Sequence, residues 1–123
     1  MVNANTPPVQ KGTENAALVN RRAAERSTIR IEAICETTDA SNAPYYCTVL
    51  VISLSTHGAG CITPCSIPRG KIVRLELTNG AKTVWHTRSA RVVHARPAGV
   101  GNAIIGCEFL TPLEKEEYRE LLQ

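Results

Sequence analysis

Hydrophobic and polar residues alternate with a period of two along most of this chain. Between residues 28 and 35, the side chains of Ile29, Ile31, Ala33 and Cys35 fall on one face of an extended chain. Similar β-rich patterns recur over residues 45–54, 71–78, 81–95 and 102–110. Turn-forming residues separate these runs, Asn79-Gly80 most clearly. The pattern predicts five or six short antiparallel strands.

The run over residues 45–54 matters most for the placement of polar side chains. Simple alternation puts Val49, Val51 and Ser53 on one face of this strand and Leu50, Ile52 and Leu54 on the other. Hairpin pairing with the strand over 28–35 is the natural expectation, because a polar turn cluster joins the two.

The pattern changes at residue 111 to that of a helix. Thr111, Pro112 and Glu114 follow the order of an N-cap, a first-turn proline and a capping-box acid. A narrow apolar stripe follows, formed by Tyr118, Leu121 and Leu122. Many short strands and one terminal helix predict a mainly β fold, a small closed or nearly closed barrel with the helix over an open end.

Composition limits the number of domains, the class of partner and the location. The 123 residues fit one domain, with residues 1–20 expected to be a flexible polar tail and 21–123 the folded part. A net charge of +3 is too small to indicate a nucleic acid polymer as partner. No stretch is apolar enough for a membrane span and the start does not resemble a secretion signal, so a cytoplasmic location is expected.

The reactive residue types give no sign of catalysis or metal binding. Five cysteines form an odd set without a C-x-x-C pair, and most lie in apolar runs, where reduced thiols pack as small hydrophobes. The three histidines, His57, His86 and His94, have no serine or aspartate partner at a recognisable spacing. We therefore expect neither an enzyme, a metal site nor a cofactor.

Two short motifs are the best candidates for function. Arg22 and Arg26 stand four residues apart just ahead of the first predicted strand, and Arg21 precedes them. Arginine can fork onto phosphate or a guanine edge and can stack on a base. On the second strand, 27 positions after Arg26, Ser53 begins a segment in which Ser55 shares its predicted face and Gly58 follows at the turn.

Together these motifs resemble the signature of the PilZ family of cyclic di-GMP (c-di-GMP) receptors over about residues 21–122. That signature is R-x-x-x-R followed by Asp or Asn, x-S-x-x-G. Ser53 stands where the family carries Asp or Asn, whereas Arg22, Arg26, Ser55 and Gly58 match. The resemblance implies a six-stranded barrel with a C-terminal helix. It also implies that the arginines grip c-di-GMP, that residues 53 and 55 accept hydrogen bonds from a guanine, and that Gly58 leaves space for the base. An arginine at position 21 resembles members that hold a stacked pair of ligand molecules.

Two functions of different classes follow. In the first, the chain is a stand-alone c-di-GMP-binding signalling adaptor whose conformation changes on binding and so regulates an unidentified protein effector in motility, biofilm formation or an envelope process. In the second, it is a degenerate interaction module that keeps the barrel and binds no nucleotide. Ser53 favours the second function, and the four matching residues favour the first.

Overall fold

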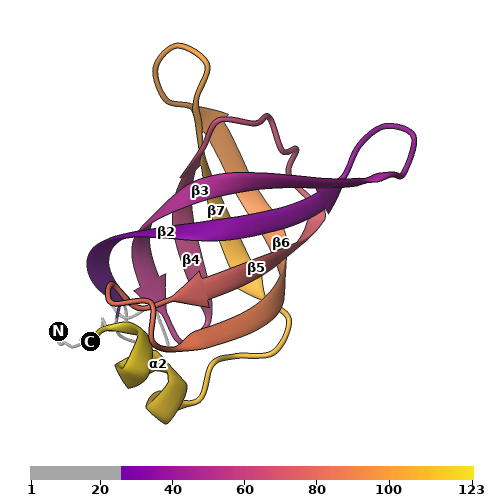
Figure 1. Cartoon of the computed structure of the whole chain (residues 1–123). Coiled ribbons are helices and arrows are strands. Elements are labelled where there is room, and N and C mark those ends of the chain that lie inside the picture. Colours follow the sequence, from indigo (N-terminus) through magenta and orange to yellow (C-terminus); the bar gives the residue numbers. More distant parts are fainter. Residues whose placement is uncertain (1–25) are drawn as a thin grey trace, which may run out of the picture.

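The computed structural model describes residues 26–123 of the chain. The predicted tail, 1–20, and the candidate residues Arg21 and Arg22 lie outside this part. Within it, six strands are followed by one short helix (Figure 1). In chain order they are β2 (Arg26–Thr38), β3 (Pro44–Ser55), β4 (Gly58–Thr63), β5 (Ile72–Thr78), β6 (Trp85–Pro97), β7 (Ala103–Phe109) and α2 (Lys115–Leu121).

The six described strands close into an antiparallel barrel. Their order around the barrel is β2-β3-β4-β7-β6-β5, and β5 pairs back onto β2 through Cys35 and Leu75. Helix α2 lies at one end of the barrel (Figure 1). The structure therefore confirms the predicted mainly β architecture with a C-terminal helix. In residues 26–123 no helix has the length and apolar character needed to cross a membrane.

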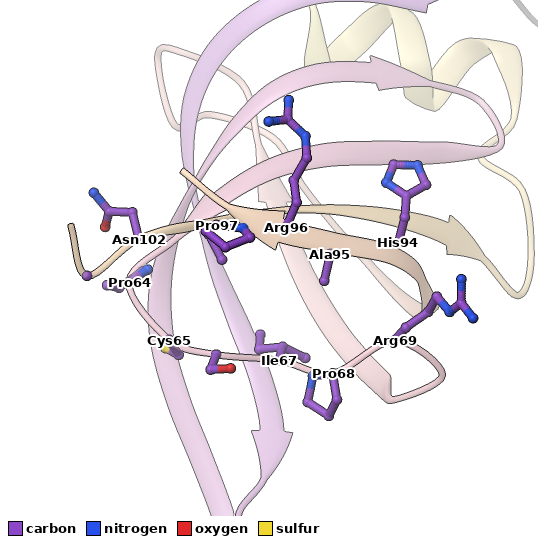
Figure 2. Close-up of a pocket in the computed structure, with 13 residues that line it drawn as sticks. Pro64, Cys65, Ile67, Pro68, Arg69, His94, Ala95, Arg96, Pro97 and Asn102 are labelled. Atoms are coloured by element: carbon purple, nitrogen blue, oxygen red, sulfur yellow. The ribbon is translucent and has the colours of Figure 1, made fainter. Parts of the chain in front are cut away.

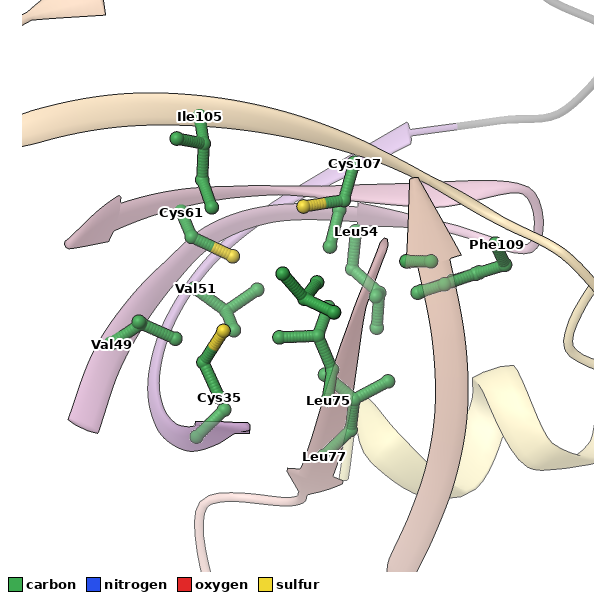
Figure 3. Close-up of a cluster of buried hydrophobic side chains, with 14 of the residues drawn as sticks. Cys35, Val49, Val51, Leu54, Cys61, Leu75, Leu77, Ile105, Cys107 and Phe109 are labelled. Carbon is green, nitrogen blue, oxygen red and sulfur yellow. The ribbon is translucent and has the colours of Figure 1, made fainter. Parts of the chain in front are cut away.

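The barrel interior holds the hydrophobic core, as the period-two pattern predicts. Ala33 and Cys35 are buried, and Ile29 packs against the same cluster. Figure 3 shows side chains from several strands meeting inside the barrel, among them Leu54, Leu75 and Phe109. Burying one such leucine contributes about 1.5–3 kcal/mol. The core thus fixes which strand residues point outward to solvent.

A β-bulge in β3 overturns the predicted face of Ser53. Val51 pairs with Cys61 of β4 and Ser53 pairs with Gly60, so Ile52 is an extra residue on β3. The extra residue shifts the alternation by one. Leu54, at 1% exposure, takes the inward position that simple alternation gave to Ser53, and the serine faces outward. The expectation that Ser53 shares the face of Val49 and Val51 was wrong, because a leucine gains more from burial than a serine.

The helix begins later than its sequence signals predict. Glu114, rather than Thr111, is the N-cap residue, and its backbone N–H donates to the Glu117 side chain at 2.8 Å. Leu113 is buried and its N–H donates to the Thr56 carbonyl at 2.8 Å, which holds the preceding segment against the barrel. Leu122 is 40% exposed and so does not belong to the buried stripe.

Candidate functional site

The structure brings the two halves of the sequence motif together. Arg26 begins β2, and Ser53 lies near the end of the neighbouring strand β3. The guanidinium Nη1 of Arg26 donates a hydrogen bond to Ser53 Oγ at 2.9 Å. The contact lies on the outer surface of the barrel, where a ligand has access to both side chains.

A row of paired residues continues from Ser53 across the outer surface. Ser53 pairs with Gly60 of β4, Gly60 with Gly106 of β7, and Gly106 with His94 of β6. A Cβ on Gly60 would lie 2.6 Å from Ser53 Oγ, and one on Gly106 would overlap the His94 ring. The serine and the imidazole therefore lean over the two glycines from opposite ends.

These residues line an open groove of about 520 Å³ with a glycine floor. A bulge precedes each wall residue, since Val93 is an extra residue ahead of His94 just as Ile52 is ahead of Ser53. Bulges redirect side chains and are common beside functional sites. Gly60 and Gly106 carry no side chains of their own, but the Ser53 hydroxyl and the His94 ring cover them, so a planar group can approach the strands closely only when these two side chains turn aside.

Ser55 and Gly58 also have roles in the turn between β3 and β4. Ser55 is 3% exposed, and its hydroxyl accepts hydrogen bonds from the backbone N–H groups of His57 and Gly58, both at 3.2 Å. A Cβ on Gly58 would overlap the Cys107 carbonyl oxygen, so glycine lets β4 approach β7 here. Gly58 lines the groove beside Arg26 and Ser53, and Ser55 lies in the turn beside them.

Sequence reasoning missed His94, Gly60 and Gly106. His94 was considered only as a member of a hydrolytic triad, for which it lacks partners. For Gly106 the available signal was a glycine inside the predicted strand over 102–110, because a glycine there often marks a close approach to the backbone. Gly60 was assigned to the turn after the strand over 45–54, whereas the structure places it in β4. In the described residues no group of three or more His, Cys, Asp or Glu side chains is placed to hold a metal ion.

Helix α2 is connected to both sides of the Arg26–Ser53 contact. The Tyr118 hydroxyl hydrogen-bonds with the Ser27 hydroxyl, and it donates to the Leu54 carbonyl at 3.4 Å. Ser27 follows Arg26 in the chain, and Leu54 follows Ser53. The tyrosine hydroxyl therefore links α2 to the residue next to Arg26 and to the residue next to Ser53.

Further contacts fix the helix against β6. Arg88 pairs with Glu117, while the His86 Nε2 atom lies 2.9 Å from Glu120 Oε1. Hydrogen bonding by the Glu114 N–H, helped by the charge of Arg88, lowers the pKa of Glu117 below its usual value. The Glu117 carboxylate is thus held in its charged form in the first turn of the helix.

Comparison with known families places the chain. The family described as PilZ domain matches residues 20–123. The chain belongs to the PilZ family, as its motifs suggested. The family consists of receptors and adaptors rather than enzymes. A search of curated proteins found no match.

Solved structures share the fold at low sequence identity. The inhibitor of motility MotI/DgrA of Bacillus subtilis is 14% identical with a TM-score of 0.66, over 94% of this chain and 53% of that chain. The PilZ domain of YcgR from Escherichia coli, solved with c-di-GMP, is 18% identical with a TM-score of 0.56, over 82% of this chain and 86% of that one. The MrkH–c-di-GMP complex of K. pneumonia is 15% identical with a TM-score of 0.56, over 81% of this chain and 49% of that one. The chain thus spans only about half the length of MotI/DgrA and of MrkH, and the likeness concerns the fold.

Proposed function

We propose that the glycine-floored groove binds c-di-GMP and that the chain is a receptor that regulates a protein partner. The hydrogen bond between Arg26 and Ser53 at the edge of this floor carries the proposal, because it joins both halves of the motif at one surface. Family membership and the c-di-GMP complexes of YcgR and MrkH support the choice of ligand.

The chemistry of the groove suits this ligand. A cyclic dinucleotide presents two phosphates, two flat guanine bases and the guanine acceptors O6 and N7. Arg26 supplies a donor fork for phosphate or for a guanine edge, and Arg22 supplies a second one from four residues earlier. The paired glycines Gly60 and Gly106 give a base room to lie against the strands once the Ser53 hydroxyl and the His94 ring, which cover them, turn aside.

The remaining motif residues have subsidiary roles in the proposal. Ser55 holds the turn that presents Gly58, and its hydroxyl is the second acceptor that the family resemblance assigns to guanine. Arg21 is proposed to influence whether one or two ligand molecules are held. Arg21 and Arg22 precede the described residues, so their part rests on the motif alone.

Ser53 weakens the site without removing it. Its hydroxyl offers a neutral acceptor, and a hydrogen bond to a charged group contributes about 1.5–3 kcal/mol against about 0.5–1.5 kcal/mol for a neutral one. Because residue 53 faces outward, an aspartate there is not forced into the core. In the unliganded protein that aspartate would pair with Arg26, but an exposed ion pair stabilises by only about 0–1 kcal/mol. Ser53→Asp should therefore tighten binding, by roughly tenfold.

Regulation is proposed to run through Tyr118. When the ligand draws Arg26 away from Ser53, Ser27 and Leu54 move with their neighbours, and both contact the tyrosine hydroxyl. Helix α2 then shifts at the end of the barrel and alters the surface offered to a protein effector. The ligand acts by stabilising the shifted state relative to the starting one.

Calorimetric titration with c-di-GMP tests the proposal. Arg22→Ala and Arg26→Ala should each cost about 2–4 kcal/mol and abolish binding at micromolar ligand. Arg30→Ala is the matched control, since it removes an exposed arginine of the same strand that does not line the groove. Circular dichroism checks that all variants are folded.

The same titration distinguishes the alternative function. If folded wild type and folded Ser53→Asp both fail to bind c-di-GMP, the receptor function is refuted. The chain is then an interaction module without a nucleotide ligand, as the serine at position 53 would favour.

A further inference from the structure

Three cysteines come from neighbouring segments, namely strand β2, strand β3 and the loop after β4. Cys35 of β2 pairs directly with Cys47 of β3. Leu50 of β3 pairs with Ile62 of β4, and β4 ends at Thr63, so Cys65 follows in the loop just beyond the strand that lies beside Cys47. A disulfide needs Cβ atoms about 3.5–4.5 Å apart, so the loop position of Cys65 matters because it can adjust to that span.

Cys47 and Cys65 share a hydrogen-bonding partner, the Thr63 hydroxyl. The Thr63 hydroxyl lies 3.8 Å from Cys47 Sγ and accepts a hydrogen bond from the Cys65 backbone N–H at 3.1 Å. The Tyr45 hydroxyl donates to Cys65 Sγ at 3.5 Å. Thr63 is fully buried, so its hydroxyl is a fixed anchor between the two cysteines.

Cys65 is more accessible to reagents from solvent than the cysteines of the core. Figure 2 shows it on the loop that faces Ala95 and Pro97 of β6, where it lines a hollow of about 640 Å³. A second hollow, beside the turn between β2 and β3, is also lined by Cys65. The thiols of Cys61 and Cys107 point into the hydrophobic cluster (Figure 3). A small reagent therefore reaches Cys65 and not those two.

The thiols of Cys65 and Cys47 also differ in acidity. Partial burial raises the pKa of Cys65, but hydrogen bonds from Cys47, Tyr45 and Thr63 outweigh it and the pKa is lowered. Burial, with the hydrogen bond to Cys65, raises the pKa of Cys47 to about 11. Because the thiolate is the nucleophilic form of cysteine, Cys65 is the more reactive member of the pair.

We propose that Cys65 and Cys47 are a redox-sensitive dithiol, converted by a peroxide to an intramolecular disulfide. The Cys65 thiolate attacks one oxygen of hydrogen peroxide, the O–O bond breaks, and the departing hydroxide takes up a proton to become water. The resulting Cys65 sulfenic acid is then attacked by the Cys47 sulfur, which loses its proton. The S–O bond breaks, and hydroxide leaves with that proton as a second water.

The step is balanced and reversible. Two thiols are oxidised while one peroxide is reduced to two waters, and a small dithiol such as dithiothreitol restores the starting state. The disulfide would tie β3 to the loop after β4. This inference is independent of the proposed function, because neither cysteine lines the glycine-floored groove.

Peptide mapping of the peroxide-treated, folded chain tests the proposal. Remaining thiols are alkylated after unfolding, and disulfide-linked peptides are identified by mass spectrometry. No Lys or Arg lies between Arg30 and Arg69, so trypsin alone leaves four cysteines in one peptide. Chymotrypsin is added because it cleaves after Tyr46, Leu50 and Leu54 and so separates Cys47 from Cys65.

The expected product is a Cys47–Cys65 link, with the other three thiols alkylated. Before oxidation, the native protein should be alkylated at Cys65 at least about tenfold faster than at Cys61. Cys47→Ser should leave a Cys65 sulfenic acid that dimedone traps, and Cys65→Ser should prevent the reaction, while the control Cys107→Ala keeps the link.

Three results would overturn the proposal. One is a link between Cys61 and Cys107 in place of the expected pair. Another is oxidation of Cys65 to sulfinic or sulfonic acid in wild type with no link to Cys47. The third is equal native alkylation of Cys65 and Cys61. The wild-type map decides the matter even where a variant fails to fold.

Discussion

Two glycines only two positions apart on β4 should respond in opposite ways to the same substitution. A methyl group on Gly58 would overlap the backbone carbonyl oxygen of Cys107 in the adjacent strand. A methyl group on Gly60 would instead meet the Ser53 Oγ atom at 2.6 Å, and that atom is the end of a side chain that can rotate. Gly58→Ala should therefore destabilise the fold, whereas Gly60→Ala should change only the groove.

The sizes of the two effects follow from these contacts. For Gly58→Ala, overpacking costs about 1–3 kcal/mol, and each weakened ladder hydrogen bond to β7 adds about 0.5–1.5 kcal/mol. We expect a loss of about 2–4 kcal/mol in the free energy of unfolding. For Gly60→Ala, the reduced chain entropy of alanine gains about 0.5–1 kcal/mol and offsets the cost of moving Ser53. Its stability should stay within about 1 kcal/mol of wild type.

The affinity for c-di-GMP should change on Gly60→Ala, although this substitution leaves the stability nearly unchanged. Gly60→Ala raises the floor and displaces Ser53, so affinity for c-di-GMP should fall by about tenfold or more, which corresponds to about 1.4 kcal/mol. Urea unfolding followed by circular dichroism gives the stabilities, and calorimetry on the folded variant gives the affinity. Gly60→Ala that binds like wild type would refute the role of the floor. Equal destabilisation by both substitutions would refute the geometry assigned to Ser53.

Further predictions concern the helix and the cysteines. Tyr118→Phe removes the hydroxyl that contacts Ser27 and Leu54, and urea titration should show a loss of about 0.5–1.5 kcal/mol. Because the folded-state pKa of Glu117 lies below the usual 4.5, its stabilising effect is present above that pH and lost as the pH falls through the folded value. Glu117→Gln should therefore lower the denaturation midpoint at pH 7, and the difference from wild type should vanish in acid. Chelator should leave the melting temperature unchanged, and a fall in that temperature, or metal found by elemental analysis, would contradict the expectation that the cysteines hold no metal ion.

The overall fold was predictable because it depends on local patterns. A period of two, turn residues and a capping signal are each read from a few neighbouring residues, and together they define a barrel with a terminal helix. The helix start was misplaced because Leu113 is held by a tertiary contact to Thr56, which local capping signals do not contain.

The groove was only partly predictable because it depends on register. Nothing in the residues around Ile52 shows that it is a bulge; the preference emerges when Leu54 competes with Ser53 for the core. Gly60 and Gly106 are adjacent only because β4 pairs with β7 and not with the next strand in the sequence. Arg26 and Ser53 were found because a family signature records their partnership directly.

A nuclear magnetic resonance titration with c-di-GMP tests the central claim most directly, since the glycine amides report on separate parts of the surface. If the groove is the binding site, the amide signals of Ser53, Gly60 and Gly106 should shift with ligand concentration and saturate. Those of Gly80 and Gly101, in loops away from the groove, should stay in place. Shifts centred on those loops, or no shifts for the folded protein at about 1 mM ligand, a concentration that detects binding as weak as about −4 kcal/mol, would contradict the account.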